Sequence, residues 1–478
     1  MAGIYIHIPF CSQYCTYCNF YSVKQLGLRD KFVDALCNEV FARRDFFNAA
    51  TGGRNFARGE LSGDKGSSVT TLYIGGGTPS VLSLEQLATV VGAVKESFGL
   101  VLPESGVYDA PQSVSHDVLG DASHSASRDK LSDKSLHAAG IAYTNKIEEF
   151  TIEVNPNDVT PEYAAGLVAL GVNRVSMGVQ SFKDEHLAWM NRRHNAAEGK
   201  RAVGILREAG ISNISIDLIF GYAMLSEEDW EHNIREAISL KPQHISAYQM
   251  SIEPGSALGA MYKRGEYAGL SDEECEAQYR RLQSLLAEAG YDQYEISNFA
   301  LHSEDGRYRS KHNSSYWEGV PYLGLGPAAH SYTGILASEE CVSAACEYGG
   351  VRGSGPSDTT VQARRIWNNP SVKGYCDYYN GSANGRRSGE QGGEVKCKNV
   401  NGYEELTATD IFNETIMLGL RKCAGFSLEL LDAAMLGHIE SDIARLARRG
   451  LLVREGNNIR IPSDKLFVSD SIIRELFL

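Results

Sequence analysis

The fold of this protein is decided near the start of its chain, by the stretch Tyr5-Ile-His-Ile-Pro-Phe-Cys11-Ser-Gln-Tyr-Cys15-Thr-Tyr-Cys18-Asn-Phe20. The apolar residues 4–8 predict a strand, and cysteines with the spacing C-x3-C-x2-C follow that strand in a loop. In a barrel of parallel strands such a loop lies at the carboxyl ends of the strands, where active sites gather. The stretch therefore predicts a site that is built on this loop.

The cysteines of this loop predict an iron–sulfur cluster. If Cys11, Cys15 and Cys18 bind three irons of a [4Fe-4S] cubane, the fourth iron has no protein ligand and is an open coordination site. The amino and carboxylate groups of S-adenosylmethionine can chelate that iron. Electron transfer into the sulfonium would then break a carbon–sulfur bond and release a 5′-deoxyadenosyl radical.

A structural zinc site is the alternative interpretation of the same loop. Such a site would take its fourth ligand from elsewhere, for example from His7. Zinc sites usually pair their cysteines as two C-x2-C knuckles, whereas this loop contains one. The spacing therefore favours the cluster.

Short apolar segments alternate with amphipathic ones through the first 300 residues. The apolar segments predict strands at 4–8, 72–74, 150–154, 174–179, 214–220 and 244–250. The amphipathic segments predict helices, among them 84–98, 161–170 and 197–209. This alternation is typical of an α/β fold with a parallel sheet. Six strand–helix units favour an open, partial (β/α)6 TIM-like barrel over a flat sheet.

Four stretches interrupt this pattern, around residues 50–68, 101–145, 338–360 and 381–401. Most are rich in Ser, Gly and Asp, and we interpret them as surface loops. The second contains His116, His124 and His137, which could be read as a metal-binding tract. A solvated insertion fits its polar composition better.

The chain changes character at about residue 404. A helix is predicted over 409–420, and a second from the helical spacing of Leu436, Ile439, Ile443 and Leu446. The segment 451–462, LLVREGNNIRIP, predicts two short strands around a Gly-Asn-Asn turn. Helices followed by a hairpin indicate a small winged-helix-like domain. Because the chain is acidic, we expect this domain to have a structural or lid role rather than to bind DNA.

These features divide the chain into three parts. Residues 1–335 form the barrel domain and its extension, with polar insertions near 50–68 and 101–145. Residues 336–403 are an insertion-rich connector, and residues 404–478 are the C-terminal domain.

The composition excludes several classes of protein. A net charge of −14 argues against a nucleic-acid partner, because phosphate binding needs a basic face. No stretch of 18 apolar residues is present, and the first residues do not resemble a secretory signal, so we expect a cytoplasmic protein. The chain has ten cysteines, and those outside the loop are scattered, which indicates a reducing compartment.

The ordered set of motifs resembles a known family. YIHIPFCxxxCxYC is followed by GGGTPS, EVNP, GVQSF, IDLIFG and HNSSYW. Together they resemble the oxygen-independent coproporphyrinogen oxidase family of radical S-adenosylmethionine proteins, and most closely its heme-chaperone branch. The resemblance covers roughly residues 4–20, 70–99, 147–335 and 404–478.

The resemblance implies where S-adenosylmethionine binds. In the turn Gly75-Gly76-Gly77-Thr78-Pro79, glycines let a ligand approach the backbone closely, and free N–H groups could meet the methionine carboxylate or amine. Polar side chains near the ends of apolar strands also need partners, which the cofactor or a structural hydrogen bond could supply. The cofactor residues that the resemblance implies are Tyr5, Tyr17, Gly76, Gly77, Thr78, Glu153, Gln180, Arg192 and Asp217.

Three features favour the chaperone branch over the oxidases. Oxidases of this family carry a fourth cysteine two residues after the third, where this chain has Phe20, and they have an N-terminal extension that helps to enclose the porphyrinogen. The segment His312-Asn-Ser-Ser-Tyr-Trp317 matches the HNxxYW motif associated with heme binding, so the resemblance implies His312 as a heme ligand. His330 in GPAAHSY is the next candidate.

We therefore expect a heme chaperone that carries a [4Fe-4S] cluster and S-adenosylmethionine, without coproporphyrinogen oxidase activity. Its partners would be heme, an electron donor and recipient hemoproteins, among them membrane-bound respiratory components. The alternative is an oxygen-independent coproporphyrinogen III oxidase of porphyrin biosynthesis, and a third option is a radical enzyme with another substrate.

Overall fold

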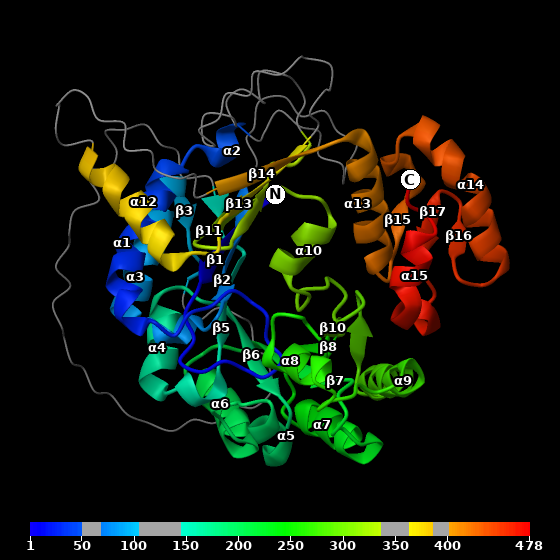
Figure 1. Ribbon diagram of the computed structural model, residues 1–478, viewed down its shortest axis with the longest axis horizontal. Helices are drawn as coiled ribbons and strands as arrows, with labels where there is room; N and C mark the ends of the chain where they lie inside the picture. Colours follow the sequence, from blue (N-terminus) through cyan, green and yellow to red (C-terminus); the bar gives the residue numbers. More distant parts are fainter. Residues whose placement is uncertain (50–67, 105–144, 336–362, 386–400) are drawn as a thin grey trace, which may run out of the picture.

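A sheet of twelve strands organises the protein (Figure 1). The computed structural model describes residues 1–49, 68–104, 145–335, 363–385 and 401–478. Most of the polar stretches expected near 50–68, 101–145, 338–360 and 381–401 lie outside these ranges. His116, His124 and His137 lie outside them as well.

Six neighbouring strands of this sheet run parallel and form the barrel. They are β1 (Ala2–Ile8), β2 (Val69–Gly76), β5 (Glu149–Val154), β6 (Arg174–Gln180), β7 (Asn213–Phe220) and β8 (His244–Gln249). At the two ends of this row, β1 pairs with β11 (Tyr322–Leu325) and β8 pairs with β10 (Asn298–Leu301), so the barrel stays open. The α/β class and the partial barrel predicted from the sequence are confirmed.

The helices between the barrel strands cover its outer side (Figure 1). They include α1 (Arg29–Ala42), α3 (Leu84–Phe98), α4 (Pro161–Ala169), α6 (Ala196–Glu208) and α7 (Glu227–Ser239). Local signals set their ends: α3 begins with a capping box between Ser83 and Gln86 and ends at Gly99, whose φ of +59° suits a residue without a Cβ.

Alternation along β1 separates the outer core from the barrel interior. Ile4, Ile6 and Ile8 are fully buried and belong to the hydrophobic core. Tyr5 and His7 point to the opposite face, because successive side chains in a strand alternate. The interior of the barrel is therefore available for polar residues.

An antiparallel extension continues the sheet beyond β11. It consists of β12 (His330–Tyr332), β13 (Ala363–Asn368) and β14 (Asn401–Leu406). With α12 (Val372–Gly385), β13 lies inside the segment 336–403 expected to be a loop-rich connector. This part of the segment is ordered against the barrel domain, because α12 buries Tyr375 and Tyr379. Their hydroxyls donate to the Glu39 carboxylate of α1 at 2.6 and 3.3 Å.

The C-terminal part contains α13 (Ala408–Arg421), α14 (Ala433–Arg448), α15 (Ser469–Arg474) and a small antiparallel sheet of three strands. Its hairpin joins β16 (Val453–Glu455) to β17 (Asn458–Arg460), so the turn is Gly456-Asn457 and the third predicted turn residue, Asn458, is in the strand. The domain boundaries drawn from the sequence stay a prediction. None of the helices in the described ranges combines the length and the apolar character that a membrane span requires.

Candidate cluster and cofactor site

The cysteines of the loop after β1 line one cavity of about 1010 Å³ at the carboxyl ends of the barrel strands. Cys11 is buried, whereas Cys15 and Cys18 are half-buried. The loop is held at several points: the Cys11 amide donates to the Val23 carbonyl at 3.1 Å, and the Thr16 amide donates to the Met190 carbonyl at 3.1 Å. The fold thus presents all three thiols to the same space.

The three cysteine sulfurs do not form a group compact enough to bind a single zinc ion as they stand. Tetrahedral ligands 2.3 Å from zinc lie about 3.8 Å from one another. Among the described residues, the one group of His, Cys, Asp or Glu side chains whose ligand atoms all lie within 4.8 Å of one another does not contain these cysteines. His7 is also engaged, with Nε2 3.0 Å from the Tyr21 carbonyl oxygen and Nδ1 3.2 Å from the Tyr5 hydroxyl. The zinc interpretation therefore loses His7, the fourth ligand that the sequence offered as an example.

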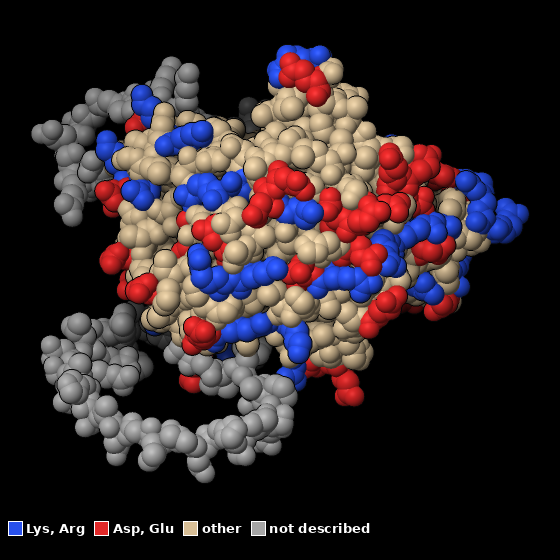
Figure 2. Space-filling view, turned by 90° about the horizontal axis from the view of Figure 1, so that it is seen from below, with Lys and Arg blue, Asp and Glu red and all other residues tan. Residues whose placement is uncertain are grey.

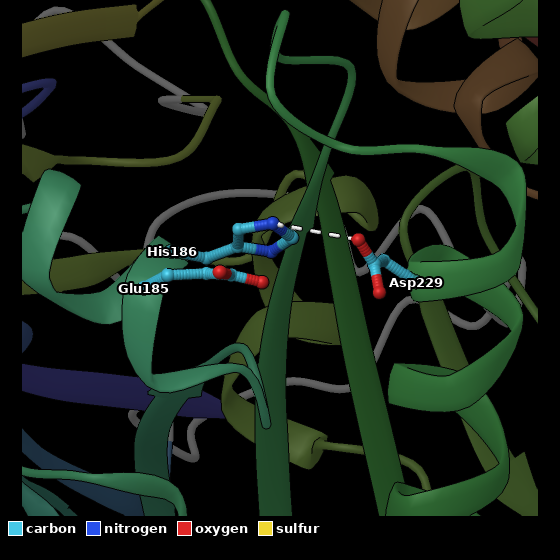
Figure 3. A group of neighbouring side chains, drawn as sticks. All are labelled: Glu185, His186 and Asp229. Carbon is cyan, nitrogen blue, oxygen red and sulfur yellow. Dashed lines mark ion pairs between the residues drawn. The ribbon is translucent and has the colours of Figure 1, made fainter.

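The group that does meet this distance is Glu185, His186 and Asp229, between α5 (Asp184–Trp189) and α7 (Figure 3). Both carboxylates already have a cationic partner, because Lys183 Nζ lies 2.8 Å from Asp229 and 3.6 Å from Glu185. His186 Nδ1 is 3.0 Å from the Tyr222 hydroxyl. We interpret the group as an ion-pair cluster that ties α5 to α7.

Two amides of the glycine turn at the end of β2 are already hydrogen-bonded, in contrast to the expectation from the sequence. The Gly76 amide donates to Glu153 Oε2 at 3.1 Å, and the Gly77 amide donates to the Ile8 carbonyl at 2.9 Å. Neither N–H group is therefore free to meet the methionine end of S-adenosylmethionine, as the sequence had suggested. The two amides instead connect β2 to β5 and to β1.

The turn contributes through its close approach to the cysteine loop. A Cβ on Gly77 would lie 2.7 Å from the Phe10 carbonyl oxygen and 3.0 Å from Cys11 Sγ, so only glycine fits there. The next residue, Thr78, is buried with Oγ1 3.5 Å from Cys11 Sγ, and it accepts a hydrogen bond from Asn155 Nδ2 at 3.3 Å. The turn thereby fixes the first cysteine.

Two carboxyl groups face the cavity from neighbouring parts of the barrel. Glu153 accepts a hydrogen bond from the Tyr73 hydroxyl at 2.8 Å, and Asp217 accepts one from Ser176 at 3.2 Å. Burial raises the pKa of Glu153 to about 7 and that of Asp217 to about 6. A cationic ligand in the cavity would find two carboxyl groups that are readily ionised at neutral pH.

Gln180 and Arg192 complete this wall of the cavity. Gln180 ends β6 with a φ of +68°, a conformation that side-chain-bearing residues seldom adopt and that is found at functional sites. The Arg192 guanidinium bridges several elements: Nη1 is 3.2 Å from Cys15 Sγ, while Nη2 donates to Asn155 Oδ1 at 2.6 Å and to the Gly178 carbonyl at 2.7 Å. A positive charge therefore lies beside the cysteine loop.

The two tyrosines among the predicted cofactor residues line different cavities. Tyr17 lines the cavity with the cysteines. Tyr5 instead lines a second cavity of about 810 Å³, with its hydroxyl 3.2 Å from His7 Nδ1. The other predicted cofactor residues thus line the cavity with the cysteines, whereas Tyr5 packs against Tyr73 of that lining, with ring centroids 6.0 Å apart.

Several residues of the cavity wall were not expected from the sequence, notably Tyr73, Asn155, Arg174 and Ser246. Asn155 stands within the EVNP motif, and Arg174 is a charged residue at the start of an apolar strand, so both carried a signal. Arg174 and Arg192 each have a buried Nε for which the described part of the chain supplies no hydrogen-bond partner. Unpartnered buried donors in a cavity that also contains two carboxyl groups fit a zwitterionic ligand such as S-adenosylmethionine.

His312 lies outside both cavity linings. It is the second residue of α10 (Lys311–Trp317), is 1% exposed, and has Nδ1 2.9 Å from Thr71 Oγ1 and Nε2 2.9 Å from the Tyr316 hydroxyl. Burial lowers its pKa to about 3, so the ring is neutral. Because both nitrogens are hydrogen-bonded inside the protein, this arrangement offers no free nitrogen to a heme iron, contrary to the expectation.

The charge pattern of the surface is mixed where it can be seen. Figure 2 shows acidic and basic side chains interspersed over one face of the molecule. The expectation that nucleic acid is not a partner stays a prediction.

Known families and solved structures that resemble this chain indicate the same class of protein as the site does. Residues 5–237 match the radical SAM superfamily, and residues 406–464 match the HemN C-terminal domain. The fold is similar to that of coproporphyrinogen III oxidase (HemN) from Escherichia coli, with a TM-score of 0.65 and 19% identity over 100% of this chain and 90% of that one. A barrel of this kind with its three-cysteine loop defines a radical SAM protein, a class that implies a [4Fe-4S] cluster and S-adenosylmethionine.

The curated relatives narrow the class further. Heme chaperone HemW from Lactococcus lactis is 30% identical over 69% of both chains, and that from Escherichia coli K12 is 30% identical over the same shares. HemW from Mycobacterium tuberculosis H37Rv is 27% identical over 99% of this chain and 94% of its own. The chain belongs to the HemW family of radical SAM proteins.

Proposed function

We propose that this protein is a heme chaperone, which binds heme and transfers it to hemoproteins while carrying a [4Fe-4S] cluster and S-adenosylmethionine. The family name of its relatives supports the heme cargo, and the cavity with the cysteines supports the two cofactors. An electron donor and recipient hemoproteins, including membrane-bound respiratory components, are the partners in this proposal. The cytoplasmic location stays a prediction.

Phe20 is the observation that carries the choice of a chaperone over an oxidase. It stands where the oxidases of the resembling family have a fourth cysteine, and the residue is 76% exposed beside the cysteine loop. An aromatic ring at this position cannot ligate iron or donate a hydrogen atom as a thiol can. Phe20 lines both cavities, so it lies between the cofactor site and the neighbouring space.

The proposed roles of the site residues follow from their positions. Cys11, Cys15 and Cys18 would hold the cluster, which when bound supplies an electron to S-adenosylmethionine. Gly77 and Thr78 would keep Cys11 in place. The cavity residues that would bind S-adenosylmethionine are Tyr17, Gly76, Gly77, Thr78, Glu153, Gln180, Arg192 and Asp217.

The choice between chaperone and oxidase can be tested on anaerobically reconstituted protein with about four irons per chain. One sample receives heme and another receives coproporphyrinogen III with S-adenosylmethionine and a reductant. We expect a heme absorption band and no protoporphyrinogen IX. Turnover of coproporphyrinogen III at the rate of an authentic oxidase assayed alongside would overturn the proposal in favour of the oxidase.

A further inference from the structure

The second cavity lies between the extended sheet and the C-terminal part of the chain. Its walls come from the end of α10, from β11 and β12, from β13 and from α13. Its volume of about 810 Å³ falls within the range of about 300–1,000 Å³ that is usual for ligand pockets. Aromatic and other large side chains line it, including Trp317, Tyr322, Tyr332, Met417 and Leu418. Such a wall suits a large, flat, apolar ligand.

His330 is the histidine that this cavity offers to a metal. It lies on β12, is exposed, and its ring stacks on Trp367 of β13 with centroids 5.9 Å apart and an angle of 25° between the planes. Within the described ranges, no hydrogen bond to either ring nitrogen is present. Partial desolvation by the surrounding cavity wall, followed by the charge of Arg365, lowers its pKa, so the ring is neutral at pH 7 and has a free nitrogen lone pair.

The other histidines near this region do not have that freedom. Both ring nitrogens of His312 and both of His7 are within hydrogen-bond distance of protein groups. Coordination by either would require breaking buried hydrogen bonds. His330 can bind without such a rearrangement.

Lys422 gives the cavity a positive charge. It is half-buried at the end of α13, and no ion pair within 4 Å is found for it among the described residues. Burial lowers its pKa, while Glu318 opposes that effect. Arg365 also lines the cavity, but its guanidinium already pairs with Glu414 and Glu404. Lys422 is therefore the cation left to pair with an anionic ligand.

We propose that this second cavity is the heme site, with His330 as an axial ligand of the iron and Lys422 paired with a propionate. Heme combines the three properties that the cavity matches: a flat apolar macrocycle, an iron that accepts imidazole, and carboxylates at one edge. This inference rests on the proposed function. Phe20 and Tyr21, which follow the cysteine loop, also line this cavity, so bound heme would lie next to the cluster loop.

The test is a heme titration of the reconstituted full-length protein, followed by absorption and electron paramagnetic resonance spectroscopy. His330→Ala should lose the spectrum of a histidine-ligated heme and weaken binding by about tenfold or more. In His330→Gly, added imidazole should restore the spectrum, which a purely structural role would not allow. Lys422→Ala should weaken binding and Lys422→Arg should restore it. The matched control is His302→Ala, because His302 is exposed and bonds to Asp292 at 2.8 Å, away from both cavities.

The possible failures are distinguishable. If wild-type protein binds heme and His330→Ala binds it with the same affinity and spectrum, this inference is overturned while the chaperone proposal stands. If wild-type protein binds no heme, the proposed function itself is overturned.

Discussion

Arg192 Nη1 lies 3.2 Å from Cys15 Sγ, although 177 residues separate the two along the chain. Asn155 and the Gly178 carbonyl hold the same guanidinium from the other side, so the charge is fixed beside the cysteine loop whether or not a ligand is bound. A fixed cation next to a thiolate stabilises an added electron on a cluster at that position. Arg192 in the barrel wall should therefore influence the reduction potential of a cluster bound by the loop.

Replacing Arg192 should therefore change the potential of the cluster. We expect Arg192→Met to lower the midpoint potential by on the order of 100 mV, from the loss of one charge a few ångströms away. A redox titration followed by paramagnetic resonance measures this shift. Iron content should stay near that of the wild type, and Arg193→Met, at the neighbouring residue that pairs with Asp158, is the control. An unchanged potential would show that the charge does not act on the cluster.

Gly77 should be essential for the position of Cys11. In Gly77→Ala the new Cβ would meet the Phe10 carbonyl oxygen at 2.7 Å and Cys11 Sγ at 3.0 Å, so the loop must shift. We expect loss of most of the bound iron after reconstitution, measured with an iron and sulfide assay. Gly92→Ala is the matched control, because Gly92 lies in the middle of α3 with nothing within 4 Å of the added Cβ. That change should preserve the iron and stabilise the protein by up to about 1 kcal/mol.

The affinity for S-adenosylmethionine should increase with pH between 6 and 8. Burial raises the pKa of Glu153 to about 7, so the carboxyl group is largely neutral below that pH and ionised above it. A sulfonium cation favours the ionised form, and binding then releases a proton. The dissociation constant should fall by about threefold per pH unit at pH 7, where the group is half ionised, and by up to about tenfold per unit below it. Calorimetry in buffers of different ionisation enthalpy measures both effects.

Glu153→Gln should flatten this dependence. The amide keeps much of the shape and the hydrogen-bonding capacity of the carboxyl group but does not titrate. The amino group of S-adenosylmethionine titrates equally in both experiments, so the difference between the two proteins isolates residue 153. An identical pH dependence in the variant would assign the proton to another group.

His312 should matter for stability rather than for heme coordination. His312→Ala removes buried hydrogen bonds to Thr71 and Tyr316 and leaves space in the barrel wall, which should cost about 2–4 kcal/mol. Denaturant unfolding measures this loss. The fraction that remains folded should bind heme with an unchanged spectrum. A spectrum that lacks histidine ligation in the folded variant would restore His312 as the ligand.

The barrel and the cysteine loop could be predicted because their signals are local. Ile4, Ile6 and Ile8 carry the strand pattern, and the three cysteines are close together in the sequence. The motifs also contain most of the proposed cofactor residues, which line one cavity. These motifs lie in barrel strands or directly after them, and the carboxyl ends of parallel strands meet at one edge of the sheet.

The second cavity could not be predicted, because it exists only in the tertiary structure. His330 comes from β12, Lys422 follows α13, and Tyr5 belongs to β1, so no local pattern joins them. His312 was predicted from its motif, but the Glu149 carboxylate accepts from the amides of Lys311 and His312 at 2.8 and 3.0 Å and fixes the start of α10 inside the protein. Sequence periodicity carries no information about such a contact across the barrel.

Heme transfer is the measurement that tests the central claim most directly. Heme-loaded protein is mixed with an apo-cytochrome of the respiratory chain, and in parallel with a passive heme-binding protein that only reports spontaneous release. Both reactions are followed by the absorption band of the acceptor. A chaperone should transfer heme to the cytochrome faster than it releases heme to the passive acceptor, and at a rate that rises with cytochrome concentration. Equal rates, independent of cytochrome concentration, would mean that heme merely dissociates and would contradict the account.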